Sequence, residues 1–117
     1  MWYSFVEILK IEKDEMAARA TTDSSSPWFS GHFPDDPILP GIAQLKMVAD
    51  LIAFSREDEI RMCGLSRVKF RKIIRPGELL DIQAERDNNE NQYSFRISGS
   101  SADICSGMMF FARKGKK

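Results

Sequence analysis

One apolar stretch, GIAQLKMVADLIAF at positions 41–54, most constrains the fold that this chain can adopt. Its apolar residues occupy most sides of a helix, so the helix should be buried on nearly all of its faces. Pro40 precedes it, and a proline suits the first turn of a helix, where a missing N–H costs no hydrogen bond. The rest of the chain must therefore supply a surface that surrounds this helix.

The segments on either side of the helix have the composition and alternation of β-strands. Two of them precede it, WYSFVEILKIEK and DEMAARATTD, joined by a tight turn at Lys13 and Asp14. SREDEIRM is a polar exit from the helix, and the strands that follow are GLSRVKFRKII, ELLDIQAER, YSFRISGS and ADICSGMMFFARK. Turns such as RPG and DNNENQ join these strands, so they should be antiparallel.

This order predicts an α+β domain over residues 1–117, in which an antiparallel sheet wraps around one long central helix. In GLSRVKFRKII, the alternation places Val68, Phe70 and Ile73 on one side and the basic residues on the other. One helix in one curved sheet leaves sheet edges and the helix mouth open. An edge-to-edge homodimer would cover them.

Composition narrows the function classes. The chain is 43% apolar and 29% charged, which is typical of a globular domain. Its 17 basic and 17 acidic residues balance, whereas nucleic-acid binders usually carry a basic excess. No apolar run approaches the roughly 18 residues of a membrane span, and the N-terminus gains acidic residues too early for a secretory signal. Cys63 and Cys105 fit reduced structural thiols. We expect a cytoplasmic protein without nucleic-acid or membrane partners.

The only histidine, His32, lies in the proline-rich loop SGHFPDDPILP just before the helix. A neutral imidazole is a good general base near pH 7. Proton abstraction beside a carbonyl also needs a donor for the developing enolate oxygen, and unpaired N–H groups at a helix N-terminus supply one. Gly41 has no side chain to block approach, so His32 and the Gly41 N–H are a candidate base and oxyanion donor. The competing interpretation is a structural histidine packed beside Phe33, which composition alone favours.

A resemblance changes that balance. GHFPDDPILPGIAQLKMVAD resembles the signature of the 3-hydroxyacyl-[acyl-carrier-protein] dehydratases, a hot-dog-fold family whose pattern reads approximately GHFPxxPxxPGVLxxEAMAQ. The matching residues are Gly31, His32, Phe33, Pro34, Pro37, Pro40 and Gly41. Further along, VKFRKIIRPGELLDIQAE is similar to the family's strand–turn–strand segment. The PHRYPF-type opening of the family is absent, so the chain is identified as a divergent member.

The resemblance implies a hot-dog domain that dimerises, or forms a higher oligomer of dimers, and binds an acyl thioester in a tunnel at the dimer interface. His32 would remove the proton from C2 of a 3-hydroxyacyl chain, and the Gly41 N–H would bind the thioester oxygen. Phe33, Pro40 and Ile42 would contact the substrate. The partner would be an acyl carrier protein or a coenzyme A thioester, in fatty acid or related lipid or polyketide synthesis. No cofactor or metal is expected.

The chain departs from the family at the residue that assists departure of the hydroxyl. The family's acidic residue lies fourteen positions after the histidine, where this chain has Lys46, and the next polar family position is Asp50. Three interpretations remain open: Asp50 takes over, the Lys46 ammonium donates after burial lowers its pKa, or the two residues form an i,i+4 ion pair and the dyad is lost. Gln44 is a lesser candidate, since it faces another side of the helix.

A basic cluster, Lys69, Arg71, Lys72 and Arg75, surrounds Phe70. Such a run is most often a solvated strand face. Its functional interpretation is a docking patch for an acidic carrier protein or for phosphate groups. Two alternatives to the dehydratase also remain: a thioesterase on the same fold, with water activated by a carboxylate, and a non-catalytic protein that binds acyl carriers.

Overall fold

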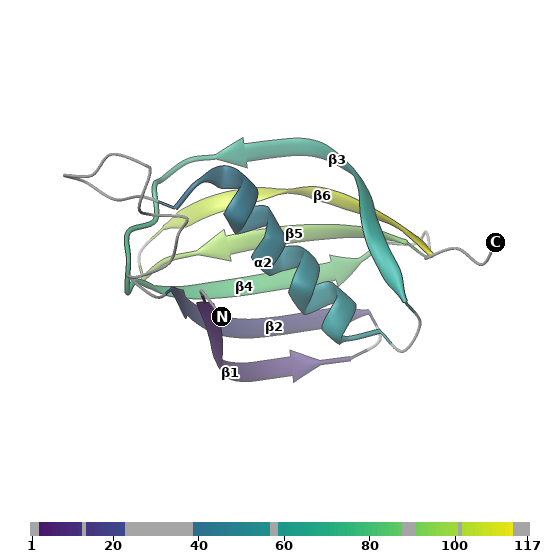
Figure 1. Ribbon diagram of the computed structural model, residues 1–117, viewed down its shortest axis with the longest axis horizontal. Helices are drawn as coiled ribbons and strands as arrows, with labels where there is room; N and C mark the ends of the chain where they lie inside the picture. Colours follow the sequence, from purple (N-terminus) through teal and green to yellow (C-terminus); the bar gives the residue numbers. More distant parts are fainter. Residues whose placement is uncertain are drawn as a thin grey trace.

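The structure, a computed structural model, describes residues 3–12, 14–22, 39–56, 59–87, 91–100 and 102–113. Figure 1 shows the order of its elements. These are β1 (Tyr3–Ile11), β2 (Glu15–Thr22), α2 (Gly41–Phe54), β3 (Ile60–Phe70), β4 (Leu79–Arg86), β5 (Gln92–Ser98) and β6 (Asp103–Arg113). In these ranges the predicted order of two strands, a helix and four strands is confirmed, and the helix has the predicted bounds.

The strands form one six-stranded sheet with the order β1-β2-β4-β5-β6-β3, and every neighbouring pair is antiparallel. The RPG segment is a turn, with Gly77 at φ +82°. It does not close a hairpin, however, because β3 pairs with β6 and not with β4. The connection after β3 therefore carries the chain past β6 and β5, and β1 and β3 become the two edges of the sheet.

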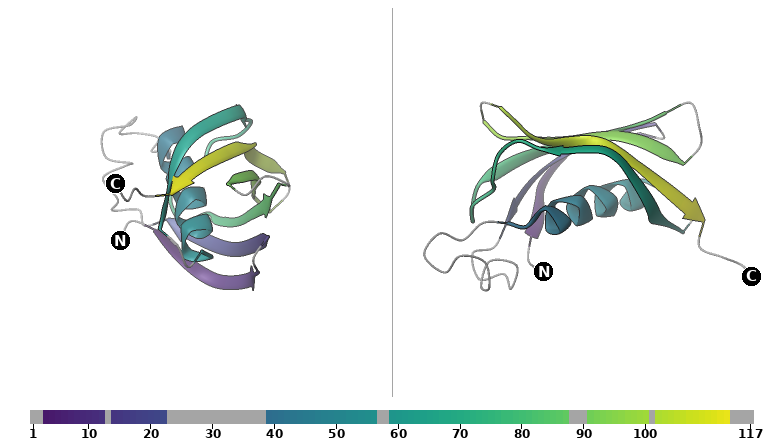
Figure 2. Two further views of the ribbon diagram at one scale, coloured as in Figure 1. Left: turned by 90° about the vertical axis from the view of Figure 1, so that its right-hand side faces the viewer. Right: turned by 90° about the horizontal axis from the view of Figure 1, so that it is seen from above.

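The sheet curves around α2, as Figure 2 shows from two further directions. Alternate residues of the central strands point toward the helix and are buried: Met16, Ala18, Ala20, Leu80, Ile82, Ala84, Tyr93, Phe95 and Ile97. Ala18 and Ala20 are small, which lets the helix pack closely against β2. From the helix, Ala43, Met47, Val48, Leu51 and Ile52 complete this core. The predicted α+β hot-dog arrangement, a sheet wrapped around one helix, is confirmed.

The helix is less enclosed than the sequence predicts. One stripe along α2 faces away from the sheet, because Ile42 is 59% exposed and the Lys46 side chain is 57% exposed. Ala53 continues this stripe, with Ala49 half-buried between them. A single sheet can cover only the side of a helix that it contacts, so a single chain leaves this stripe open.

Strand β3 also differs from its prediction. It begins at Ile60, within the segment expected to be a polar exit, and it ends at Phe70. Arg67 adopts a positive φ of 57°, and the register with β6 shifts between Ser66 and Lys69. Such a bulge adds a residue to one strand and breaks the alternation of its side chains. Phe70 lies opposite the buried Cys105 and its ring reaches Gly41, yet it is 49% exposed, and Ile73 beyond the end of β3 is 45% exposed.

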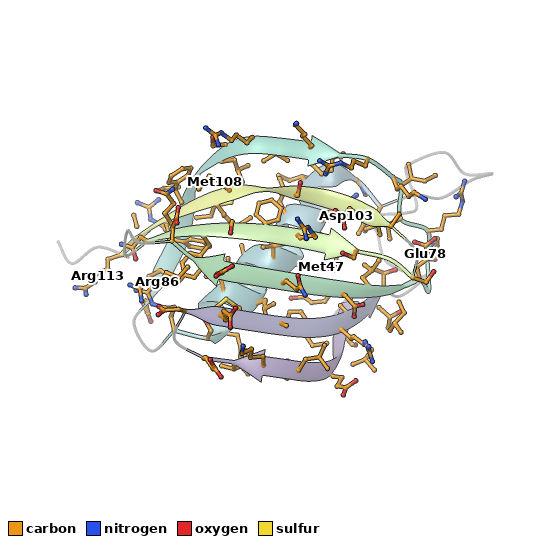
Figure 3. The ribbon with its side chains drawn as sticks, turned by 180° about the vertical axis from the view of Figure 1, so that it is seen from behind. Met47, Glu78, Arg86, Asp103, Met108 and Arg113 are labelled. Atoms are coloured by element: carbon orange, nitrogen blue, oxygen red, sulfur yellow. The ribbon has the colours of Figure 1, made fainter. Side chains whose placement is uncertain are left out.

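Figure 3 shows the outer face of the sheet, with α2 and its Met47 behind it. Polar and charged side chains cover this face, among them those of Gln83, Glu85, Ser94 and Arg96, which alternate with the buried residues of β4 and β5. This alternation is typical of an antiparallel sheet with one solvated face. In the described part of the chain, no helix has the length and apolar content needed to cross a membrane.

Candidate active site

The first turn of α2 presents unpaired backbone donors. Pro40 is the N-cap residue and makes no side-chain hydrogen bond to the helix. Its carbonyl accepts from the N–H groups of Ala43 and Gln44, at 3.1 and 3.2 Å. Among the described residues, nothing accepts a hydrogen bond from Gly41 or Ile42 N–H. These two groups lie at the positive end of the helix dipole, so they can bind an oxygen that gains negative charge.

An aromatic ring covers the side of Gly41 where a side chain would be. A Cβ atom added at Gly41 would lie 2.7 Å from Cζ of Phe70, which real Cβ contacts essentially never do. Leu39 N–H donates to the Ile74 carbonyl at 2.7 Å, which holds the connection after β3 against the helix start. Glycine at position 41 therefore lets the half-exposed ring of Phe70 lie directly against the backbone that carries the free N–H.

Gln44 is buried beneath this turn, with 3% of its surface exposed. Its Nε2 donates to the Leu39 carbonyl at 3.4 Å, a long hydrogen bond. Its Oε1 has no partner among the described residues. The side chain thus helps to position the residue that leads into the helix. It points away from Lys46, as expected from their spacing.

Further along α2, Lys46 and Asp50 are joined as the third interpretation predicted. Lys46 Nζ donates to Asp50 Oδ1 at 3.1 Å, an i,i+4 ion pair that confirms this part of the prediction. The second carboxylate oxygen has a partner that the sequence did not indicate: the hydroxyl of Tyr3 donates to Asp50 Oδ2 at 2.6 Å. Burial, and then the hydrogen bond and charge of Asp50, raise the pKa of Tyr3 well above its usual value. Tyr3 therefore remains protonated and a donor.

The contacts among Tyr3, Asp50 and Lys46 bear on the other two interpretations, in which Asp50 replaces the family's acid or the Lys46 ammonium is the donor. Each Asp50 oxygen accepts one hydrogen bond from a protein group, which fixes the carboxylate between Tyr3 and Lys46. The ammonium of Lys46 has three donors, of which one goes to Asp50. The burial that the second interpretation required of Lys46 is not provided by a single chain, since its side chain is 57% exposed.

The structure therefore places some of the expected site residues and leaves others outside its described ranges. Pro40, Gly41 and Ile42 meet at the helix start. Lys46 and Asp50 follow about 7 and 14 Å along the helix axis from Gly41, at 1.5 Å per residue. The expected base, His32, and Phe33 lie outside the described residues. Two further side chains belong to this region, Phe70 over Gly41 and Tyr3 on Asp50, and neither contact was predicted.

The basic cluster lies next to the helix start and is exposed, at Lys69, Arg71, Lys72 and Arg75. Arg71 is tied to β6, because its Nη1 donates to Ser106 Oγ at 2.9 Å and its backbone N–H to the Ile104 carbonyl at 2.7 Å. A hollow of about 250 Å³ lies beside Lys72, between the connection after β3 and the β5–β6 turn. The cluster is thus a fixed positive surface close to Gly41.

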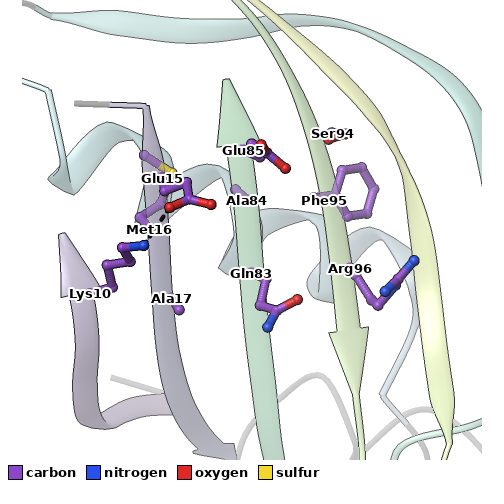
Figure 4. A pocket seen from close by; sticks show the side chains of 10 residues that line it. All are labelled: Lys10, Glu15, Met16, Ala17, Gln83, Ala84, Glu85, Ser94, Phe95 and Arg96. Atoms are coloured by element: carbon purple, nitrogen blue, oxygen red, sulfur yellow. Dashed lines mark hydrogen bonds and ion pairs between the residues drawn. The ribbon is translucent and has the colours of Figure 1, made fainter. Parts of the chain in front are cut away.

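A second hollow, of about 340 Å³, lies on the outer face of the sheet (Figure 4). Charged and polar side chains line much of it, including Lys10, Gln83, Glu85 and Arg96, and Lys10 forms an ion pair there with Glu15. The whole sheet separates this hollow from α2. It therefore has no part in the chemistry of the helix start.

A comparison with known families identifies the chain. The model of the ApeI-like family, described as ApeI dehydratase, matches residues 9–108. The chain belongs to the ApeI-like dehydratase family. It is also 28% identical over 123 aligned residues to the 3-hydroxyacyl-[acyl-carrier-protein] dehydratase FabZ of Clostridium perfringens, covering 94% of this chain and 88% of that protein. The predicted dehydratase resemblance is confirmed.

Solved structures agree on the fold of this ApeI-like chain. The dehydratase heterocomplex ApeI:P from Xenorhabdus doucetiae superposes with a TM-score of 0.86 at 24% identity, over 97% of this chain and 100% of that one. A hypothetical thioesterase with coenzyme A from Streptococcus pneumoniae superposes less well, with a TM-score of 0.64 at 14% identity, over 97% and 88% of the two chains. These structures support the hot-dog fold, and the sequence relatives favour a hydro-lyase over a thioesterase.

Proposed function

We propose that this chain dehydrates 3-hydroxyacyl thioesters to 2-enoyl thioesters, with the acyl group carried by an acyl carrier protein or coenzyme A. The observation that carries this proposal is the dehydratase family match over residues 9–108, which includes both the histidine loop and α2. The N–H of Gly41, which has no acceptor among the described residues, supports it, because the reaction develops negative charge on the thioester oxygen.

Each step assigns a role to one group. The imidazole of His32 takes the proton from C2, and the electron pair of that C–H bond moves toward the thioester carbonyl, whose oxygen the Gly41 N–H stabilises. The C3–O bond then breaks, the C2–C3 double bond forms, and the hydroxyl leaves as water after gaining a proton. The ammonium of Lys46 is the donor that faces the departing oxygen, and Asp50 holds it by the observed 3.1 Å hydrogen bond. In this proposal Phe33, Pro40 and Ile42 contact the substrate.

We further propose that the working unit is a dimer. The exposed stripe on α2, with Ile42 and Lys46, and the edge of β3, which has no second neighbour among the described strands, would both gain cover from a second copy. Covering the stripe would also desolvate Lys46, which the single chain does not. Sedimentation equilibrium at micromolar concentration should give twice the mass of one chain. A monomer at that concentration would contradict this part of the proposal.

The basic cluster fits the same function as a docking surface. Lys69 and Lys72 have no ion-pair partner in the described ranges and stand near the helix start, so they can attract an acidic carrier protein or the phosphate of its prosthetic arm. The alternative thioesterase function has less support, because the matching family model and the curated relatives are dehydratases. If it holds, Asp50→Asn should abolish thioester hydrolysis and leave binding intact.

The decisive experiment follows the enoyl absorbance of a short 2-enoyl and 3-hydroxyacyl thioester pair with wild type, His32→Ala and Lys46→Glu. We expect activity in wild type and a loss of at least about 100-fold in His32→Ala, since a positioned general base contributes that much. Activity only in Lys46→Glu would mean that the scaffold remains but the chemistry was lost at one position. No dehydratase activity in any of the three proteins would favour a thioesterase or a carrier-binding protein. A His32→Ala variant that functions like wild type would favour the same two alternatives.

A further inference from the structure

The hydrogen bond between Tyr3 and Asp50 joins the first strand to the middle of the central helix. Tyr3 is 3% exposed, and its hydroxyl lies 2.6 Å from Asp50 Oδ2 although 47 positions separate the two residues. The Tyr3 ring is fixed in turn by an edge-to-face contact with Phe5, with ring centroids 5.2 Å apart. The register of β1 with β2 shifts between Phe5 and Glu7, and Tyr3 at the start of β1 reaches the helix. Figure 1 shows that β1 is bent.

The Lys46 ammonium can donate to one fixed position only if another group restrains it. The Lys46 side chain is long and 57% exposed, and an exposed i,i+4 ion pair alone holds a side chain only weakly. A carboxylate on a free surface would move together with its lysine. Here the Asp50 carboxylate is held from two directions, by a buried hydroxyl on Oδ2 and by the ammonium on Oδ1. Its orientation is therefore set by the Tyr3 hydroxyl as well as by the lysine.

We propose that Tyr3 is a positioning residue, which fixes Asp50 so that the Lys46 ammonium points to the 3-hydroxyl group of the bound acyl chain. This inference rests on the proposed function for the identity of that hydroxyl. A purely structural Tyr3 would fasten β1 to α2 and would affect all ligands alike. A positioning Tyr3 affects the recognition of the hydroxyl group alone, and this difference can be measured.

The test compares two non-hydrolysable pantetheine thioester analogues, in which a methylene replaces the sulfur, one carrying the 3-hydroxyl and one lacking it. Their dissociation constants are measured by calorimetry for wild type, Tyr3→Phe and Asp50→Asn. The matched control is Tyr93→Phe, which removes a buried hydroxyl that accepts a hydrogen bond from Arg56 Nη1 at 3.0 Å in another part of the fold. Thermal unfolding of each variant checks that it is folded.

We expect wild type to bind the hydroxylated analogue about tenfold more tightly, as a hydrogen bond to a charged group would give. Tyr3→Phe and Asp50→Asn should bring that ratio to within about twofold of one while the affinity for the analogue without the hydroxyl stays the same. Tyr93→Phe should keep the wild-type ratio. With turnover, Tyr3→Phe should lower kcat about tenfold with little change in KM.

Three results would overturn the inference alone: a wild type that binds both analogues without preference, a Tyr3→Phe protein that keeps the preference, or one that loses affinity for both analogues equally. A preference without any turnover would contradict the proposed function but leave the positioning role of Tyr3 intact. A wild type that binds neither analogue would overturn both.

Discussion

The two ends of α2 are built in opposite ways. At the carboxyl end, Ser55 N–H donates to the carbonyls of Leu51 and Ile52, Arg56 N–H donates to Ala53, and Ser55 Oγ donates to Ile52 at 2.6 Å. At the amino end Pro40 offers no side-chain cap, and the Gly41 N–H remains without a partner among the described residues.

Helix ends are normally satisfied by capping groups, and an uncapped end loses stability. The protein accepts this loss at one end of α2 only, beside Phe70 and the basic cluster. The difference fits the proposed role of the amino end, whose N–H groups would bind the substrate oxygen, whereas the carboxyl end serves the fold. The following experiments test this difference.

Capping the open end should have the largest effect. In Pro40→Asp a carboxylate can accept from the N–H groups of the first turn, and it places a negative charge where the thioester oxygen would bind. Relative to Pro40→Ala, which also lacks the proline ring, we expect about 0.5–2 kcal/mol of added stability and a fall in kcat/KM of about 100-fold. Urea unfolding and the enoyl assay measure the two changes. Equal activity in both variants would show that the open end does not bind the substrate oxygen.

Adding a methyl group at the open end should have the next largest effect. In Gly41→Ala the new Cβ would meet the Phe70 ring at 2.7 Å, so the ring or the helix start must shift. A displacement of about 1 Å in an active site can cost up to about 100-fold in rate, and we expect a fall of at least tenfold. The double variant Gly41→Ala, Phe70→Ala should recover part of it. If the double variant is no better, the clash with Phe70 is not the cause.

Charge near the open end should affect recognition of the carrier and not the chemistry. Lys69→Glu reverses a charge beside Phe70, whereas Arg61→Glu reverses one near the other end of the same strand. We expect Lys69→Glu to raise KM for an acyl carrier substrate about three- to tenfold, to weaken its salt dependence and to leave kcat unchanged. Arg61→Glu is the control and should change neither. A similar increase in both variants would indicate a general charge effect and no docking site.

The closed end should give the smallest effect. Ser55→Ala removes the hydrogen bond from Ser55 Oγ to the Ile52 carbonyl, and the backbone bonds of Ser55 and Arg56 remain. We expect a loss of about 0.5–1.5 kcal/mol in the free energy of unfolding and no change in kcat/KM, measured by urea unfolding and the enoyl assay. A clear loss of activity would mean that the carboxyl end also contributes to the site.

Local features of the chain were predictable because they depend on short-range rules. The bounds of α2 follow from the proline before it and the apolar run within it, and the Lys46–Asp50 ion pair follows from i,i+4 spacing. The alternation of β4 and β5 likewise matches their burial. Each of these depends on residues within one element.

The features that sequence reasoning missed depend on how distant elements meet. The Phe70 ring reaches Gly41 because β3 pairs with β6 at the sheet edge, and the bulge at Arg67 shifts the register of β3 just before Phe70. The Tyr3–Asp50 hydrogen bond depends on a bend in β1. No local pattern reports a bulge or a pairing across 47 positions. The family pattern indicated that the acidic residue is replaced at position 46. It did not indicate that Tyr3 would contact the Asp50 carboxylate, which holds Lys46.

The position of β3 in the sheet has a consequence for how the protein assembles. Strands β4, β5 and β6 are neighbours both in sequence and in the sheet, so they can pair early at low entropic cost. β3 pairs with β6, with Ile60 opposite Arg113, and must close a long loop to do so. We therefore expect β3 to dock last in folding and to detach first on local unfolding. Phe70 would then leave Gly41 while the meander is intact, and hydrogen exchange should show β3 amides losing protection before those of β5.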